Sequence, residues 1–452
     1  MKKGYLIGLI IACCLISGCG RSGPDTDLLP DLEEDVSRPN ITTTVGNERR
    51  DPIITYQETL KNGVVFSVYE DGRLVLSGGD LTESIVDTPA YKDHSKDITI
   101  IEIGEGVRVV GEKVFANASS FQKLIIGDDV EQIGYYAFHG CTAMTQVAFG
   151  ADLEEIGDYA FSGCTALTDV VLEGKITRLG EYVFSGCTNL KNAILGSNIT
   201  KMGNCIFDGC SSLVSLRIGC NVSESALSNN LKLTSVVLED TVQHLERRAF
   251  SGCPELQNIT FSAGLLTVGD HAFEDCVKLK EVSLPQSVTY IGTRAFQGCT
   301  ALTTCRIGSQ VTTMGELLFS GCTALKQITC SSSIGASSFK DCTALESVTI
   351  GEGAVTVGQQ AFSGCKVLRE IILPEGVETI EDKAFYGCEG LMKLSLPKTL
   401  KTVGAEIYYG ATSLETLYYN GNYNDWSKVT CDKNWNKNPG GINYVTRYAS
   451  TY

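Results

Sequence analysis

The segment Ile156–Leu172 reads IGDYAFSGCTALTDVVL and decides the fold of this 452-residue chain. Its apolar and small positions recur along most of the sequence at a step of 23 residues, except for two steps of 20 that end at Leu227 and Phe339. A fixed period of this length indicates a solenoid of stacked units. The phenylalanine position marks fourteen units: Phe115, Phe138, Phe161, Phe184, Phe207, Leu227, Phe250, Phe273, Phe296, Phe319, Phe339, Phe362, Phe385 and Tyr408.

Each unit contains one predicted strand. Leu167, Val170 and Leu172 form an L-x-x-V-x-L segment, and its V-x-L part alternates like a short strand whose Val and Leu face a core. The I-G-x-x-A-F-x-G-C segment is too short for a long helix, so we expect a second short extended piece and a turn of 3₁₀ helix. Because one unit cannot bury its apolar side alone, stacking should join the strands into one parallel sheet, about 4.8 Å apart.

The pattern I-G-x-x-A-F-x-G-C-x-x-L-x-x-V-x-L, which recurs from Ile291 to Ile307, resembles the BspA-type (Treponema pallidum-type) leucine-rich repeat. The resemblance covers about residues 98–419. It implies a leucine-rich repeat solenoid of the α/β horseshoe class, mainly β with short 3₁₀ turns, a parallel sheet on the concave face and β caps at both ends. It also implies a bacterial cell-surface protein, since some members of the family are adhesins for host matrix proteins or other microbes.

The N-terminus has the features of an exported lipoprotein. Lys2 and Lys3 precede an apolar run from about Tyr5 to Ile16, and Ser17-Gly18-Cys19 follows. A basic region, an apolar run and small residues before the cut are typical of a secretory leader, and Cys at the first mature position resembles a bacterial lipoprotein signal. We predict that residues 1–18 are a signal peptide and that Cys19 is lipidated. The protein would then be anchored in the bacterial cell envelope, outside the cytoplasm; an uncleaved membrane anchor is the alternative.

The rest of the chain divides into four predicted parts. Residues 19–50 carry three prolines and scattered acidic residues with little apolar periodicity, which indicates a disordered tether. In residues 51–97, two alternating apolar runs flank Glu70-Asp71-Gly72-Arg73, which predicts a β-hairpin cap over the first turn of the solenoid. The solenoid itself spans residues 98–414, and residues 415–452 form an aromatic-rich C-terminal cap.

Cysteine is abundant, with nineteen residues. Equivalent residues on adjacent turns have parallel Cβ vectors about 4.8 Å apart, whereas a disulfide needs about 3.8 Å. We therefore predict buried, reduced thiols that pack as small hydrophobes next to the phenylalanines, as in the pairs Phe161 and Cys164, Phe250 and Cys253, and Phe296 and Cys299. Cys305 and Cys330 lie outside this ladder in neighbouring units, and a local bridge between them stays open. The ladder consists of Cys141, Cys164, Cys187, Cys210, Cys253, Cys276, Cys299, Cys322, Cys342, Cys365 and Cys388.

The sequence predicts no enzyme, no metal site and no cofactor. The four histidines are scattered and the mature part has no C-x-x-C, whereas structural zinc needs four convergent ligands. It contains no G-x-S-x-G and no P-loop. The formal net charge of −16 argues against nucleic acid as a partner and against binding to anionic membranes other than through a lipid anchor.

With no catalytic, metal or cofactor site predicted, the candidate functional region is the surface of the solenoid. Solenoid proteins use an extended sheet for binding. We expect an extracellular protein, from host matrix or another bacterial surface, to bind the concave sheet through Val171, Ile194, Arg217, Val237, Arg306 and Tyr418. One alternative is a glycan-binding module that uses the C-terminal aromatics Trp426 and Trp435; another is a passive envelope spacer. The outward residues of the V-x-L segments are Ala148, Val171, Ile194, Arg217, Val237, Thr260, Ser283, Arg306, Thr329, Thr349, Ile372, Ser395 and Tyr418.

Overall fold

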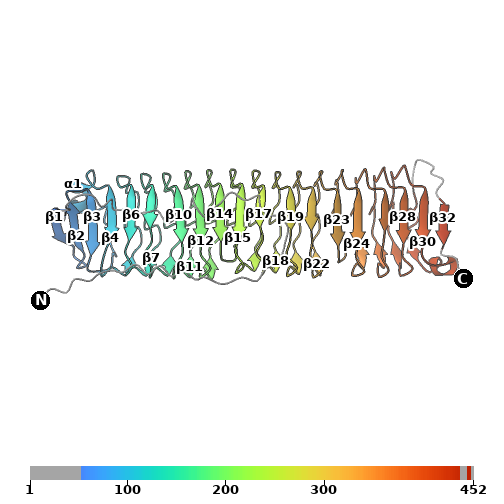
Figure 1. Ribbon diagram of the computed structural model, residues 1–452, viewed down its shortest axis with the longest axis horizontal. Coiled ribbons are helices and arrows are strands. Elements are labelled where there is room, and N and C mark those ends of the chain that lie inside the picture. The colour runs from blue at the N-terminus through green and yellow to red at the C-terminus, as the bar shows by residue number, and fades with distance from the viewer. Residues whose placement is uncertain (1–51, 438–444, 449–452) are drawn as a thin grey trace, which may run out of the picture. The chain divides into compact units, whose positions relative to one another are not determined.

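The computed structural model describes residues 52–437 and the backbone of residues 445–448, all of which belong to one compact unit, Thr44–Tyr452. This unit is a parallel β-solenoid of about 15 turns of roughly 23 residues, and its turns follow one another along a nearly straight line in Figure 1. The predicted repeat solenoid is therefore confirmed, and it is straighter than the curved horseshoe with a concave sheet that the resemblance implies. The predicted leader, Cys19 and the tether lie outside the described residues.

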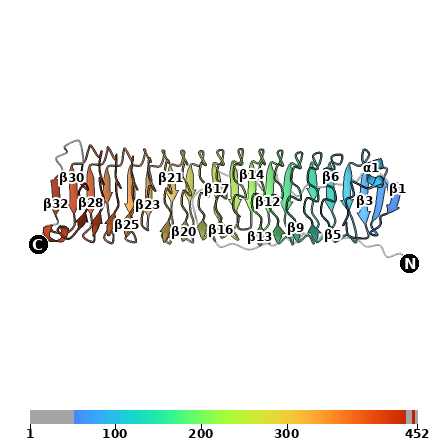
Figure 2. The ribbon, with the colours of Figure 1, turned by 180° about the vertical axis from the view of Figure 1, so that it is seen from behind.

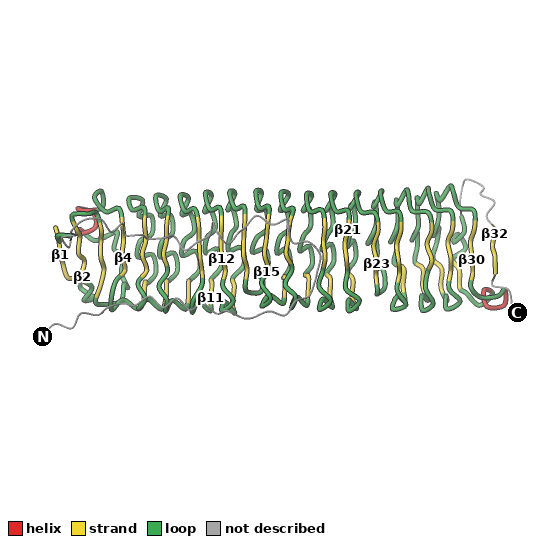
Figure 3. Tube along the Cα trace, in the orientation of Figure 1, coloured by secondary structure: helices red, strands yellow, loops and turns green. Residues whose placement is uncertain are grey.

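One strand of three or four residues from each turn builds the main surface of the solenoid. These long strands pair in parallel and in register, so that Val171 lies opposite Ile194 and Ile194 opposite Arg217. They form four sheets that succeed one another along the axis (Figure 3). The long strands are β4 (Ile100–Ile103), β6 (Lys123–Ile126), β8 (Gln146–Ala148), β10 (Asp169–Leu172), β12 (Asn192–Leu195), β14 (Ser215–Ile218), β15 (Ser235–Leu238), β17 (Asn258–Thr260), β19 (Glu281–Ser283), β21 (Thr304–Arg306), β23 (Gln327–Cys330), β24 (Ser347–Ile350), β26 (Glu370–Ile372), β28 (Lys393–Leu396), β30 (Thr416–Tyr419) and β32 (Val445–Tyr448).

The second extended piece predicted for each unit is also present, as a two-residue strand. In the two 20-residue units the missing residues shorten the corner that leads into this strand, which is reduced to single bridges at Val222 and Ile334. The short strands therefore form three separate sheets within the described residues, seen from behind in Figure 2. They are β5 (Val109–Val110), β7 (Gln132–Ile133), β9 (Glu155–Ile156), β11 (Arg178–Leu179), β13 (Lys201–Met202), β16 (His244–Leu245), β18 (Thr267–Val268), β20 (Tyr290–Ile291), β22 (Thr313–Met314), β25 (Thr356–Val357), β27 (Thr379–Ile380), β29 (Thr402–Val403) and β31 (Thr430–Cys431).

An N-terminal hairpin covers the first turn. Strand β2 (Val65–Tyr69) pairs antiparallel with β3 (Arg73–Ser77), and β3 then pairs in parallel with β4. The sequence did not predict β1 (Ile54–Thr59), which adds an antiparallel edge strand, or the short helix α1 (Pro89–His94). At the other end, helix α2 (Tyr423–Trp426) and β31 follow the last complete turn.

The core is a stack of equivalent side chains. Phe138 and Phe161 are fully buried, with ring centroids 5.2 Å apart and planes within 11° of parallel. The same arrangement continues from Phe250 to Phe385. Because each ring packs on the rings before and after it, the aromatic contact is repeated along the solenoid instead of being confined to one centre.

The segment that carries the phenylalanine consists of tight turns. Hydrogen bonds from Ser162 N to Tyr159 O and from Cys164 N to Phe161 O have the i to i+3 spacing of a 3₁₀ turn. They close separate turns, however, and the described residues contain no 3₁₀ helix. Tyr159 (φ 56°) and Gly163 (φ 73°) have left-handed backbones, which keep these turns from joining into a helix. Equivalent left-handed residues recur in every unit, and where the glycine is replaced the residue is Asn or Asp: Asn117, Asn229, Asp275 and Asp341.

The ladder cysteines are all buried free thiols, as predicted. They also donate a hydrogen bond that the sequence did not reveal. Cys164 Sγ lies 3.2 Å from the carbonyl oxygen of Phe138, one turn earlier, and that oxygen also accepts Cys141 N at 3.3 Å. Because all eleven ladder thiols make the equivalent bond, each thiol ties a turn to its predecessor. Off the ladder, Cys305 and Cys330 are likewise buried free thiols.

The left-handed glycine gives a testable prediction. Replacing Gly163 by Ala should lower the free energy of unfolding by about 1 to 2 kcal/mol, because an L-residue is strained at this φ. A clash is not the cause, since a Cβ at Gly163 would lie an ordinary 3.6 Å from Gly140 Cα. Gly163→Asn should cost less, because Asn tolerates this conformation. Thermal unfolding followed by circular dichroism compares the two variants; an equal loss would contradict the explanation.

The buried thiols should make the fold sensitive to alkali. Burial raises the pKa of the Cys253 thiol from its ordinary value of 9.0 to about 12. Between these two values the unfolded chain loses the proton and the folded chain keeps it, so the free energy of unfolding falls as the pH rises, by about 1.4 kcal/mol per pH unit for one thiol. Cys253→Ala should give a correspondingly shallower decline in denaturant titrations at pH 9 to 12. Identical slopes would contradict the prediction.

Candidate functional site

The outward residues of the long strands form two columns along one surface, which we call the long-strand face. The first column begins each V-x-L strand, and the second lies between its Val and Leu; strand register aligns both columns across neighbouring turns. The second column is the one predicted above, extended toward the N-terminus by Glu102 and Ile125. The first column includes Gln146, Asp169, Asn192, Ser215, Ser235, Asn258, Glu281, Thr304, Gln327, Ser347, Glu370, Lys393 and Thr416.

Aliphatic side chains gather at one part of the second column. Four successive strands present Ile125, Ala148, Val171 and Ile194, and Val237 follows beyond Arg217. All five are partly exposed, whereas the residues beside them in each strand are buried. We call these five residues the aliphatic stretch. The sequence had singled out Val171, Ile194 and Val237; counting back 23 residues from Ala148 would have added Ile125.

Arg217 lies between Ile194 and Val237 in the second column, and its side chain pairs with Glu239. Its Nε lies 2.6 Å from Glu239 Oε1, on the segment that follows β15. A depression of about 200 Å³ adjoins this pair at the ends of β10 and β12, and Ile194, Asn198 and Glu239 line it together with Glu173. The stretch therefore has a recess at its edge, with an ion pair fixed beside it.

The first column supplies a polar border to the aliphatic stretch. Asn192 Nδ2 donates to Asp169 Oδ1 at 2.8 Å, and Ser215 Oγ donates to Asn192 Oδ1 at 2.7 Å. These bonds link three neighbouring strands and hold the side chains in defined positions. An apolar strip beside a fixed polar row has the composition of a protein-binding surface, in which apolar contacts supply affinity and polar groups set orientation.

The remaining predicted residues lie far along the same face. Arg306 is exposed and has no ion-pair partner among the described residues; the second column around it carries Thr260, Ser283 and Thr329. Tyr418 is partly buried on β30, and Lys393 Nζ lies 5.2 Å above the centre of its ring. The structure thus brings Val171, Ile194, Arg217 and Val237 together, and leaves Arg306 and Tyr418 outside that group.

The C-terminal aromatics cover the last turn. Trp426 and Trp435 are both partly buried and pack on each other, with centroids 5.4 Å apart. Trp435 also meets the buried Tyr408 edge to face at 6.1 Å, and Trp426 meets Tyr419 at 5.0 Å. These contacts use ring surface that a glycan platform would have to present to solvent.

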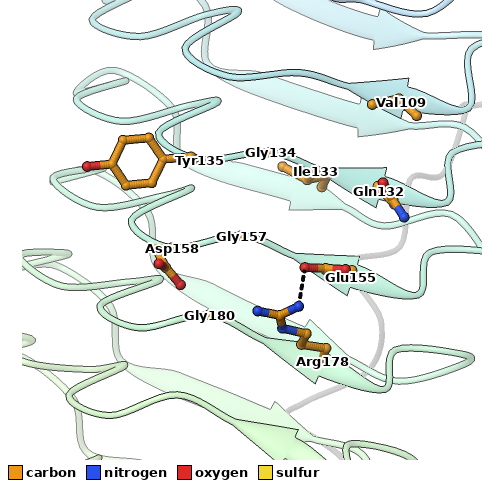
Figure 4. Close-up of a pocket in the computed structure, with 10 residues that line it drawn as sticks. All are labelled: Val109, Gln132, Ile133, Gly134, Tyr135, Glu155, Gly157, Asp158, Arg178 and Gly180. Carbon is orange, nitrogen blue, oxygen red and sulfur yellow. Dashed lines mark ion pairs between the residues drawn. The ribbon is translucent and has the colours of Figure 1, made fainter.

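A second groove lies on the short-strand side and was not found from the sequence. It has a volume of about 260 Å³, and its lining includes Tyr135, Gly157, Asp158, Glu155 and Arg178 (Figure 4). Tyr136, Tyr159 and Tyr182 stack beside Tyr135 with centroids 4.9 Å apart. The recurrence of tyrosine every 23 residues at these three positions was the signal that could have revealed the groove.

The described residues contain no group of three or more His, Cys, Asp or Glu side chains arranged to hold a metal ion. They also contain no helix long and apolar enough to cross a bilayer.

The repeat geometry defines a leucine-rich repeat solenoid. The sequence profile of the BspA-type leucine-rich repeat region matches residues 86–214, 220–334 and 332–434, and the chain belongs to this family. Leucine-rich repeat proteins are generally protein-binding surface modules, and solenoids of this family are typically non-enzymatic scaffolds.

A comparison with solved structures matched proteins from several bacteria. A leucine-rich repeat protein from Bacteroides ovatus is 23% identical, with a TM-score of 0.62 over 89% of this chain and 100% of its own, and this likeness concerns the fold. A leucine rich cell surface protein from Faecalibacterium prausnitzii is 22% identical, with a TM-score of 0.35 over 84% of this chain and 98% of its own. The T. pallidum leucine-rich repeat protein is 20% identical, with a TM-score of 0.32 over 54% of this chain and 90% of its own. A search of curated proteins found no match.

Proposed function

We propose that this protein is a lipid-anchored bacterial surface protein that binds another extracellular protein, of host matrix or of another cell, through the aliphatic stretch of the long-strand face. The observation that carries the proposal is the row of Ile125, Ala148, Val171 and Ile194 on four successive strands, beside the hydrogen-bonded Asp169 and Asn192. The row continues across the break between the sheet that ends at β8 and the sheet that begins at β10. Isolated apolar residues on a surface are ordinary, but a contiguous row with a polar border is typical of an interaction site.

The dimensions suit a protein partner. From Ile125 on β6 to Val237 on β15 the stretch crosses five strand spacings, or about 24 Å. A standard protein interface buries about 800 Å² on each side, which corresponds to a patch of this width. Because Glu239 neutralises Arg217, the partner can cover the stretch without leaving an isolated charge between the apolar residues.

The glycan-binding alternative has less support, because Trp426 and Trp435 direct their rings toward each other and toward the last turn. If the protein is a passive envelope spacer, it has no partner. A surface binding assay with matrix proteins and whole cells distinguishes this alternative from the proposal.

Placing a charge in the aliphatic stretch should abolish binding. Val171→Asp or Ile194→Asp in the full chain should weaken capture of a matrix protein or a neighbouring cell by about 30-fold or more, the effect of losing a central contact. Surface binding assays with purified matrix proteins and whole cells measure the loss. Ile372→Asp is the matched control, because Ile372 occupies the same column but lies outside the stretch and is 56% exposed.

Three results would contradict the proposal. Capture that Ile372→Asp reduces as strongly as Ile194→Asp would place the contact elsewhere on the face. Loss of capture only in Trp426→Ala or Trp435→Ala would favour the glycan-binding alternative. Absence of any captured protein or cell would favour the spacer.

Fatty-acid labelling tests the proposed lipid anchor at Cys19. Metabolic labelling with an alkyne fatty acid should label the wild-type chain, because a lipoprotein signal ends at Cys19. Cys19→Ala should lose the label and leave the cell-envelope fraction. Cys14→Ala is the matched control, since Cys14 lies within the apolar run of the leader, and it should keep the label. Label retained in Cys19→Ala would contradict lipidation at this residue.

A further inference from the structure

We propose that the groove beside Tyr135 is a binding site for a neutral carbohydrate, separate from the protein-binding surface proposed above. It lies between the short strands β7, β9 and β11 and the turns that follow them. Figure 4 shows Tyr135 and Asp158 on one side of the groove, and Gln132, Glu155 and Arg178 on the other. The groove has a floor, an aromatic side and a polar side.

Three glycines form the floor, so no side chain rises from it at these positions. Gly134, Gly157 and Gly180 occupy the same position in three successive turns, and their backbones approach closely: a Cβ at Gly157 would lie 2.9 Å from the carbonyl carbon of Gly134. The floor extends across two turn spacings, or about 10 Å. A ligand can therefore lie along the solenoid axis and contact more than one turn.

The aromatic side is a fixed platform. Tyr135 is 41% exposed, and Figure 4 shows the face of its ring turned toward the viewer at one side of the groove. Its other contacts hold it in place: Tyr136 lies edge to face at 4.2 Å and Tyr159 at 6.1 Å, and these two rings continue the tyrosine stack. A ring that is already immobilised loses little freedom when a ligand stacks on it.

The polar side offers donors and acceptors together. Arg178 Nη1 and Glu155 Oε1 form an ion pair at 3.2 Å, Gln132 is exposed next to them, and Asp158 Oδ1 across the floor accepts a hydrogen bond from Glu181 N at 2.9 Å. Guanidinium, carboxamide and carboxylate groups hydrogen-bond well to hydroxyls, which both donate and accept. A sugar presents such hydroxyls around its rim and an apolar C–H face to an aromatic ring.

The charges around the groove favour a neutral ligand. Lys113 Nζ lies 5.6 Å from the centre of the Tyr135 ring and is itself paired with Glu112, so a cationic ligand would have to compete with Lys113 for the ring. Glu155 neutralises Arg178, so an anion would meet the carboxylate of Asp158 without a free cation among the groove residues drawn in Figure 4, in a chain that already has a net charge of −16. A neutral oligosaccharide meets neither penalty.

Titration of the full chain with neutral trisaccharides tests the proposal. Maltotriose, cellotriose and mannotriose serve as probes, with trigalacturonate and trilysine as charged comparisons, and saturation-transfer NMR detects contact. We expect at least one neutral trisaccharide to bind, and Tyr135→Ala to weaken that binding by about threefold to tenfold through loss of the stacking contact. Gln132→Ala should also weaken it, and this variant leaves the tyrosine stack intact.

Tyr290→Ala is the matched control, because Tyr290 is a similarly exposed tyrosine on short strand β20, outside the groove. Its binding should equal that of the wild type. The proposal is overturned if no neutral trisaccharide binds or if only a charged probe binds. It is also overturned if Tyr290→Ala weakens trisaccharide binding as much as Tyr135→Ala does. Loss in Trp435→Ala with full binding in Tyr135→Ala and Gln132→Ala would also overturn it, since the sugar would then occupy the C-terminal aromatics.

Discussion

Backbone hydrogen bonds between successive turns, made in both directions, are the interaction on which the rest of this structure depends. Many amides that flank the strands donate toward the preceding turn, as from Gly157 N, just after β9, to Ile133 O at 2.7 Å. The amides of the phenylalanine turns donate toward the following one, as from Tyr159 N to Glu181 O and from Phe161 N to Val183 O, both 2.9 Å. The left-handed residues carry strain, and these forward bonds compensate for it. Each turn thus needs both neighbours, so both ends of the stack need a cap.

The C-terminal segment meets that need directly. The last phenylalanine-type turn donates from Glu406 N to Asn434 O at 3.1 Å and from Ile407 N to Trp435 O at 3.3 Å, although residues 432–437 contain no strand. Trp435 therefore acts through its backbone as well as its ring. This gives a physical reason for aromatic residues after the repeat that does not involve a ligand.

Much of the fold could be predicted from the sequence, because its pattern repeats. The spacing of Phe161 and Phe184 defined the period, and the V-x-L alternation located strands such as β10 and their buried side. The non-periodic parts, β1 and α1, carried no repeated signal and were missed. The hydrogen bond from the Cys164 thiol to the Phe138 carbonyl was also missed. The 23-residue spacing of the cysteines does not reveal which backbone group of the neighbouring turn each thiol contacts. In the same way, the outward columns followed from strand alternation, whereas the groove beside Tyr135 depends on how the turns fold back next to the short strands.

A regular scaffold of this kind separates stability from recognition. The inward residues are nearly invariant from unit to unit, whereas outward positions change freely: Val171, Ile194 and Arg217 are register neighbours of different chemistry. Two surfaces can then carry different properties on one core. The long-strand face offers an apolar row with a polar border, and the short-strand side offers a groove with an aromatic wall.

The most direct measurement of where a partner binds is site-specific photo-cross-linking on the intact chain. A benzophenone amino acid would be placed at Ala148 within the aliphatic stretch or at the exposed Thr313 on short strand β22, and the protein would be exposed to matrix proteins and cells before illumination. Binding through the long-strand face predicts a covalent partner from position 148 and none from position 313. Cross-linking from position 313 alone would contradict binding through the long-strand face.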